Sequence, residues 1–67
     1  MTIQINGEAV EIDGGTTVSQ LLTARNVKMP EMVSVELNGE ILVRDTFDTT
    51  CVKDGDKVEF LYFMGGG

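Results

Sequence analysis

The chain has 67 residues and a formal net charge of -6, from 11 acidic and 5 basic side chains. This length allows one small domain. The acidity argues against nucleic acid or an anionic membrane surface as a ligand, because phosphate neutralisation needs clustered Lys and Arg. There is one cysteine and no histidine, which excludes an internal disulfide and argues against a zinc site.

The composition and the N-terminal segment favour the cytoplasm. The first ten residues, MTIQINGEAV, lack the basic and apolar regions of a signal peptide. No apolar run approaches the ~20 residues of a membrane span. A chain without disulfides fits a reducing compartment. A monomer in the cytoplasm is expected.

The first elements read as a hairpin followed by a helix. Residues 2–5 and 10–12 alternate polar and apolar side chains around Asn6-Gly7, a strong signal for a tight hairpin turn. Thr17 with Gln20 forms a capping box. Val18, Leu21 and Leu22 then follow at helical spacing. The pattern predicts a helix of about three turns, ended near Asn26.

The second half reads as three strands. Residues 33–37 alternate cleanly, Asn38-Gly39 predicts a second hairpin turn, and residues 41–43 predict a short strand. Residues 44–50 are polar around Phe47, which suits a helical turn with one apolar anchor. Residues 57–64 predict the last strand.

This order of elements predicts an α+β chain with the β-grasp, or ubiquitin-like, arrangement. A mixed sheet of about five strands would carry one main helix across one face. We expect residues 1–64 to form the domain and residues 65–67 a flexible glycine tail.

Three internal features are interpreted as structural. Asp54-Gly55-Asp56 predicts a tight surface turn, and Cys51 a small, partly buried apolar residue. Arg44 lies near Asp45 and Asp48, which predicts a surface ion pair or, less strongly, a contact with a partner.

The last strand and the tail carry the functional signal. In residues 58–63, Leu61 and Phe63 fall on the face opposite Val58 and Phe60. Exposed apolar residues there would mark a protein interface. The predicted partner contacts are Leu61, Tyr62, Phe63 and Met64. Glycines lack Cβ atoms, so Gly65 and Gly66 could lead the Gly67 carboxylate through a narrow channel into another enzyme.

These residues resemble the ThiS-type sulfur carrier proteins of thiamine biosynthesis. The resemblance rests on Asn6-Gly7, on the helix start TVSQLL, on LNGEI, and above all on the closing FMGGG. It implies that Gly67 is the reacting residue of a carrier that is not itself an enzyme. A ThiF-type, ubiquitin-activating-like adenylyltransferase would use ATP to adenylate Gly67. A persulfide from a cysteine desulfurase would then convert it to a thiocarboxylate, and a ThiG-type thiazole synthase would take the sulfur. No cofactor would be bound by the chain itself.

Other functions share these features. The chain could be the small subunit of molybdopterin synthase, a sulfur carrier for cysteine or methionine synthesis, or a ubiquitin-like protein modifier. A fourth possibility is a binding module whose glycine tail has no role. The sequence does not identify the sulfur acceptor.

Overall fold

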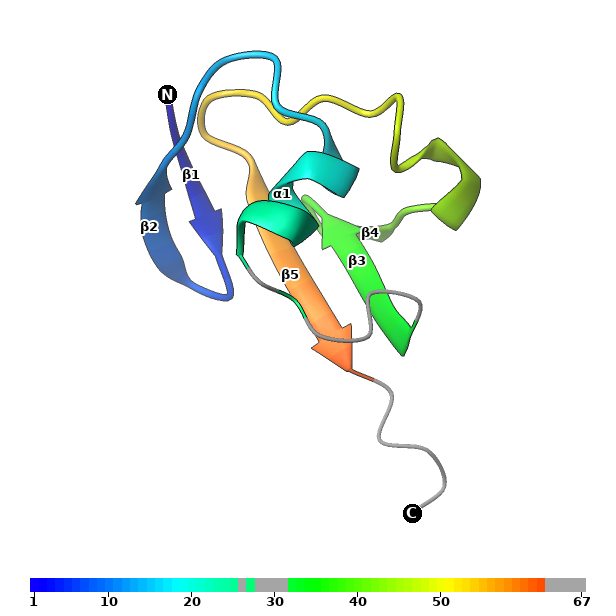
Figure 1. The fold of residues 1–67 in the computed structure, drawn as a ribbon. Helices are drawn as coiled ribbons and strands as arrows, with labels where there is room; N and C mark the ends of the chain where they lie inside the picture. Colours follow the sequence, from blue (N-terminus) through cyan, green and yellow to red (C-terminus); the bar gives the residue numbers. More distant parts are fainter. Residues whose placement is uncertain (26, 28–31, 63–67) are drawn as a thin grey trace.

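A computed structural model describes residues 1–25, 27 and 32–62, and the structural statements below concern these residues. A sheet of five strands lies beside one α-helix (Figure 1). The elements in chain order are β1 (Thr2–Ile5), β2 (Glu8–Glu11), α1 (Val18–Ala24), β3 (Val33–Leu37), β4 (Glu40–Ile41), the 3-10 helix η2 (Arg44–Thr46) and β5 (Lys57–Tyr62).

The strand order is β2-β1-β5-β3-β4, so the last strand of the chain occupies the centre of the sheet. β1 and β5 are parallel, and the other neighbouring strands are antiparallel. The mixed five-stranded sheet with one α-helix confirms the predicted β-grasp arrangement.

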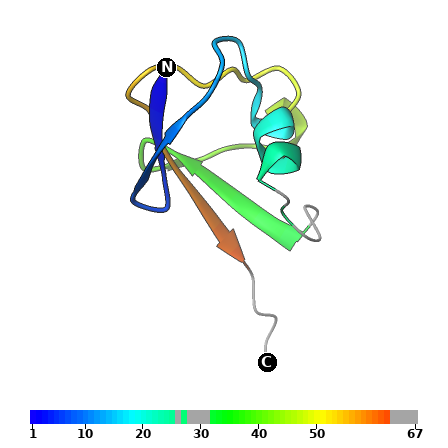
Figure 2. The ribbon, with the colours of Figure 1, turned by 60° about the vertical axis from the view of Figure 1, so that its left-hand side comes forward.

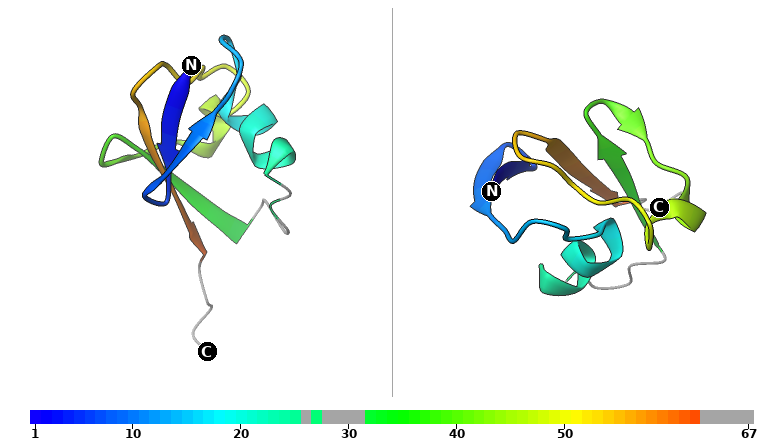
Figure 3. Two further views of the ribbon diagram at one scale, coloured as in Figure 1. Left: turned by 90° about the vertical axis from the view of Figure 1, so that its left-hand side faces the viewer. Right: turned by 90° about the horizontal axis from the view of Figure 1, so that it is seen from above.

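The helix and the sheet form two layers. Figures 2 and 3 show α1 on one side of the sheet, with no helix drawn against the opposite face. An antiparallel or mixed sheet of this kind buries one face and leaves the other to water or to a partner.

Both predicted hairpin turns are confirmed. Asn6 and Gly7 have φ of 51° and 83°, and Asn38 and Gly39 have φ of 52° and 86°. Positive φ at both central residues defines the type I′ turn, whose twist matches the twist of the flanking strands. Asparagine and glycine are the residues that adopt this conformation at least cost.

The predicted start of the helix is confirmed, but its predicted length is wrong. The Thr17 side chain accepts a hydrogen bond from the Gln20 amide, and the Gln20 side chain accepts one from the Thr17 amide. The helix then spans seven residues, which is two turns. At Arg25 the amide still bonds to the Leu21 carbonyl, but ψ is 6° and the helical path ends. Asn26, the predicted end, lies outside the described residues.

The predicted fourth strand is also shifted. It covers Glu40–Ile41 and not residues 41–43. The Leu42 amide still bonds to the Val35 carbonyl at 2.9 Å, but the chain turns into η2 from Arg44. The turn is favoured because it buries Phe47, which is 5% exposed.

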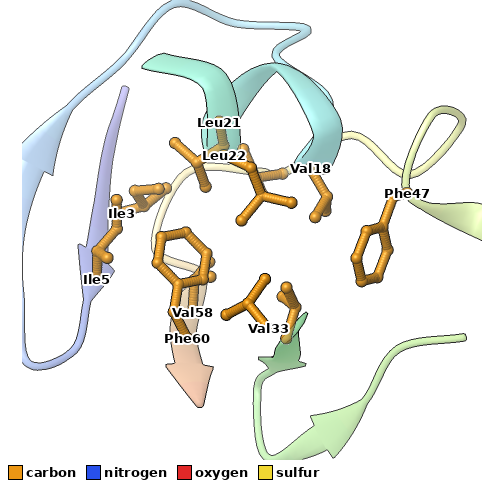
Figure 4. Packing of buried hydrophobic residues seen from close by; sticks show 11 residues of the cluster. Ile3, Ile5, Val18, Leu21, Leu22, Val33, Phe47, Val58 and Phe60 are labelled. Atoms are coloured by element: carbon orange, nitrogen blue, oxygen red, sulfur yellow. The ribbon is translucent and has the colours of Figure 1, made fainter. Parts of the chain in front are cut away.

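The core fills the space between the helix and the inner face of the sheet (Figure 4). Helix residues Val18, Leu21 and Leu22 face strand residues Ile3, Val58 and Phe60, and Phe47 closes one side. Val10 and Ile12 are half-buried against the cluster. The other buried members are Ile5, Val33, Val35 and Val52. Burial of this set is the main force that holds so short a helix on the sheet.

Candidate functional site at the end of strand β5

The candidate site is built on β5, the strand that leads to the C-terminal residues. Its first half pairs with β1 through Gln4–Lys57 and Ile5–Val58. On its other side it pairs with β3 from Leu37–Val58 to Val33–Tyr62. Because Tyr62 pairs with Val33, the sheet sets the direction of the strand as far as Tyr62.

Two asparagine side chains hold β5 in addition to the strand ladders. Asn38 Oδ1 accepts a hydrogen bond from the Lys57 amide at 2.9 Å, and Asn6 Oδ1 accepts one from the Phe60 amide at 2.9 Å. Each asparagine lies in a type I′ turn. Its backbone has the positive φ that this turn requires, and its side chain binds the central strand β5. The sequence analysis predicted the turns but missed these bonds, which depend on the strand order.

The two faces of β5 differ as predicted. Val58 and Phe60 are buried in the core, and Leu61 is 41% exposed on the opposite face. The backbone of Tyr62 pairs with Val33, while its side chain lies outside the described part. Phe63, Met64, Gly65, Gly66 and Gly67 also lie outside the described residues, so their predicted roles stay predictions.

Two further exposed apolar residues were missed by the sequence analysis. Ile41 is 61% exposed and Val43 is 66% exposed. Ile41 pairs with Glu36, which places it on the face of β3 opposite Val33 and Val35. A two-residue turn at Asn38-Gly39 pairs Ile41 with Glu36, so the register of this hairpin would have predicted that Ile41 is exposed.

The structure shows contacts of Arg44 that the sequence analysis did not predict. Its guanidinium Nη2 donates to the Val33 carbonyl at 2.6 Å, and its Cζ lies 5.3 Å from the centre of the Phe47 ring. Arg44 therefore ties the segment after β4 to the start of β3, where Val33 pairs with the last described residue of β5.

The predicted turn at residues 54–56 is confirmed, and its carboxylates act within the fold. Asp54 Oδ1 accepts a hydrogen bond from the Thr2 amide at 2.8 Å. Asp56 accepts from the Lys53 amide at 2.8 Å and from Asn38 Nδ2 at 3.0 Å. Within residues 1–25, 27 and 32–62, no group of three or more His, Cys, Asp or Glu side chains could hold a metal ion.

The prediction that Cys51 is partly buried is wrong. Its side chain is exposed, with Sγ 3.7 Å from the Gly15 carbonyl oxygen. Cys51 forms an isolated bridge with Thr17, the residue before the helix. Its neighbour Val52 fills the core position in its place.

Among the described helices, none is long and apolar enough to cross a membrane.

Comparison with known proteins covers almost the whole chain. Residues 3–67 match the model of the ThiS family. The crystal structure of the thiamine biosynthesis protein ThiS from Geobacter metallireducens is 55% identical, with a TM-score of 0.87 and 100% of both chains covered. The strands and the helix described above are therefore shared with a solved structure over its full length.

Two curated relatives are much longer than this chain. Thiazole synthases from Magnetococcus marinus and Paramagnetospirillum magneticum are 36% and 39% identical to it over 67 residues. The match covers 100% of this chain but 20% of each relative. The chain thus spans one fifth of the length of these two relatives.

Proposed function

The chain belongs to the ThiS family, and on that premise we propose that it carries sulfur on the Gly67 carboxylate for thiamine biosynthesis. The observation that carries the proposal is the central placement of β5. The strand pairs with β1 at Lys57 and Val58 and with β3 from Val58 to Tyr62, and five residues later the chain reaches Gly67. The folded domain would then present the Gly67 carboxylate at the end of three glycines, which carry no side chains.

The chemistry follows from the reactivity of a carboxylate, which is a poor acyl donor. We propose that a ThiF-type adenylyltransferase binds ATP, and that a Gly67 carboxylate oxygen attacks the α-phosphorus and releases pyrophosphate. The resulting acyl adenylate has AMP as a good leaving group. A persulfide sulfur from a cysteine desulfurase attacks the acyl carbon and expels AMP. A thiol reductant then supplies the electron pair that cleaves the acyl disulfide and leaves a thiocarboxylate.

Thiazole synthase is the acceptor that the comparisons favour. In two bacterial thiazole synthases, a segment similar to this chain is part of the same polypeptide. A carrier fused to the enzyme that uses its sulfur has a high effective concentration at that active site. We propose that the separate chain serves a ThiG-type thiazole synthase in the same way, as a co-substrate in the cytoplasm.

The direct test is the intact mass of the chain after incubation with ATP, a persulfide donor, a thiol reductant and its adenylyltransferase. Replacement of one oxygen by sulfur at Gly67 is expected. A chain lacking Gly66 and Gly67 should show no such gain and should unfold at the same temperature as the parent. A chain with one alanine added after Gly67 is the matched control, since it keeps every glycine and displaces the carboxylate. An unchanged parent mass under these conditions would refute the carrier function.

The acceptor is tested separately with the thiocarboxylated chain. Thiazole synthase should remove the sulfur and return the parent mass, whereas the large subunit of molybdopterin synthase should not. The opposite result would assign the chain to molybdopterin synthesis. Loss of sulfur to neither enzyme would favour a carrier for cysteine or methionine synthesis.

A further inference from the structure

Both hairpin turns place a glycine directly after an asparagine, at Asn6-Gly7 and Asn38-Gly39. In such a pair the glycine amide nitrogen can attack the side-chain Cγ of the asparagine, because glycine has no Cβ atom that would block the approach. A five-membered succinimide forms and ammonia leaves. Water then opens the ring at either carbonyl and gives aspartate or isoaspartate. One water is consumed, one ammonia is released, and nothing is oxidised or reduced.

The glycine amide of each turn is available as the nucleophile. Within the described part of the chain, the amides of Gly7 and Gly39 donate no hydrogen bond. The space beside each glycine is also open. Apart from the neighbouring residues, nothing lies within 4 Å of the position that a Cβ atom would take. Neither hydrogen bonding nor crowding at the glycine therefore protects the turns from this reaction.

The backbone conformation of the asparagines does protect the turns. Asn6 and Asn38 have φ of 51° and 52°. These values lie in the left-handed region, where ψ is about +47°. At this ψ the following nitrogen points away from the Cβ atom of the asparagine. Ring closure needs the nitrogen and Cγ on the same side of the Cα–C bond, so each turn must open before its asparagine can react.

The hydrogen bonds of the two asparagine side chains differ. The Asn6 amide group is held at its oxygen, where Oδ1 accepts from the Phe60 amide at 2.9 Å. Within the described residues, its Nδ2 donates to no group. The Asn38 amide group is held at both atoms. Its Oδ1 accepts from the Lys57 amide at 2.9 Å, and its Nδ2 donates to Asp56 Oδ1 at 3.0 Å. Asn38 must therefore break one more bond, to a carboxylate, before its side chain can rotate.

From this difference we propose that Asn6 is the deamidation site of the folded chain, and that isoaspartate at this position detaches the turn from β5. In isoaspartate the main chain runs through Cβ and Cγ, which adds one backbone atom to a two-residue turn. The type I′ geometry is lost, and the Phe60 amide loses its acceptor. Aspartate would leave the main chain unchanged and keep an acceptor oxygen. This inference does not depend on the proposed function.

The test follows deamidation of the full chain at mildly alkaline pH, folded and in concentrated urea, by peptide mapping with mass spectrometry. Methylation by an isoaspartyl methyltransferase distinguishes isoaspartate from aspartate. The rate in urea divided by the rate in the folded chain gives the protection of each asparagine. Protection should be at least roughly fivefold at Asn6, and roughly tenfold or more greater at Asn38, because a bond to a charged group is the stronger one.

The variant Asp56→Ala tests the reason for the difference between the two sites. It removes the acceptor of Asn38 Nδ2 and should lower the protection of Asn38 to about that of Asn6. In the same molecule Asn6 serves as the reference for any loss of overall stability, since such a loss lowers the protection of both sites. Equal protection of the two asparagines in the parent would overturn the assignment, as would faster deamidation at Asn38.

The effect on β5 is measured on purified chain that carries isoaspartate at position 6. Its unfolding temperature should be lower than that of the parent by at least about 4 °C, since one hydrogen bond and the turn geometry are lost. Amide hydrogen exchange at Phe60 should be faster. Freshly prepared Asn6→Asp is the matched control, because it has the same added charge and a normal main chain, and it should stay near the parent. An isoaspartate chain that unfolds with the parent, or together with Asn6→Asp, would overturn the detachment from β5.

Discussion

The Asn6 side chain accepts a hydrogen bond from the Phe60 amide at 2.9 Å, although 54 positions separate the two residues. Asn6 directly follows Ile5, whose pair with Val58 is the last one between β1 and β5 in the described part of the chain. Past it, β5 is paired with β3 alone. The bond therefore fixes β5 immediately before the residues that lead to the tail.

Substitutions at Asn6 should distinguish the contribution of its side-chain hydrogen bond to stability from the contribution of the turn conformation. Asn6→Gly keeps the positive φ and loses the bond, which should cost about 1–2 kcal/mol because the partly buried Phe60 amide is left without its acceptor. Asn6→Ala also loses the bond, and it should cost about 1 kcal/mol or more in addition, because the Cβ atom of alanine disfavours the left-handed backbone conformation. Urea unfolding measures both. Asn6→Asp keeps an acceptor oxygen and should stay near the parent. If Asn6→Gly is as stable as the parent, the pairing of β5 with β3 is sufficient to hold this part of the strand.

Phe47 should be critical for the fold despite its place in a polar segment. Phe47→Ala should cost about 3–5 kcal/mol, the range for an aromatic side chain removed from a core. A domain of this size has little stability in reserve, so thermal unfolding followed by circular dichroism should show a chain that is largely unfolded at 37 °C.

Two variants test the reason for the effect at Phe47. Phe47→Leu keeps most of the apolar volume and should cost under about 2 kcal/mol. Val43→Ala, in the same segment but exposed, should change the stability by less than about 0.5 kcal/mol. Similar losses for Phe47→Ala and Val43→Ala would mean that the segment does not close the core.

The capping box should matter because α1 has only two turns. Thr17→Ala should destabilise the chain by about 1 kcal/mol in urea unfolding, since the Gln20 amide loses its acceptor. Thr17→Ser keeps the hydroxyl and should lie close to the parent. Amide hydrogen exchange should show faster exchange at Gln20 in Thr17→Ala only. Unchanged exchange there would contradict the cap.

Cys51 should react as an exposed thiol. The folded chain should take up one iodoacetamide group, and alkylation should leave the gain of sulfur at Gly67 unaffected. Cys51→Ser is the matched variant for the carrier assay, because a persulfide on Cys51 adds one sulfur whereas Gly67 exchanges one oxygen for sulfur. Failure of Cys51→Ser to gain sulfur would assign the thiol a role in the transfer.

Local patterns in the sequence determined the elements of this protein. The Asn-Gly pairs define both hairpins because few residues tolerate positive φ. Alternation over residues 2–5 and 33–37 defines strands, and Thr17 with Gln20 defines the helix start. Their order was sufficient to predict the β-grasp arrangement, and the closing glycines, with the resemblance that they support, led to the sulfur carrier function.

Only the tertiary structure decided which of these elements meet. The end of α1 and the length of β4 depend on packing, since the chain after β4 turns to bury Phe47. The bond from Asn6 to Phe60 joins residues 54 positions apart, and the bond from Arg44 to Val33 joins residues 11 positions apart. The first exists because β5 enters between β1 and β3, and periodicity within one segment carries no information about its neighbours in space.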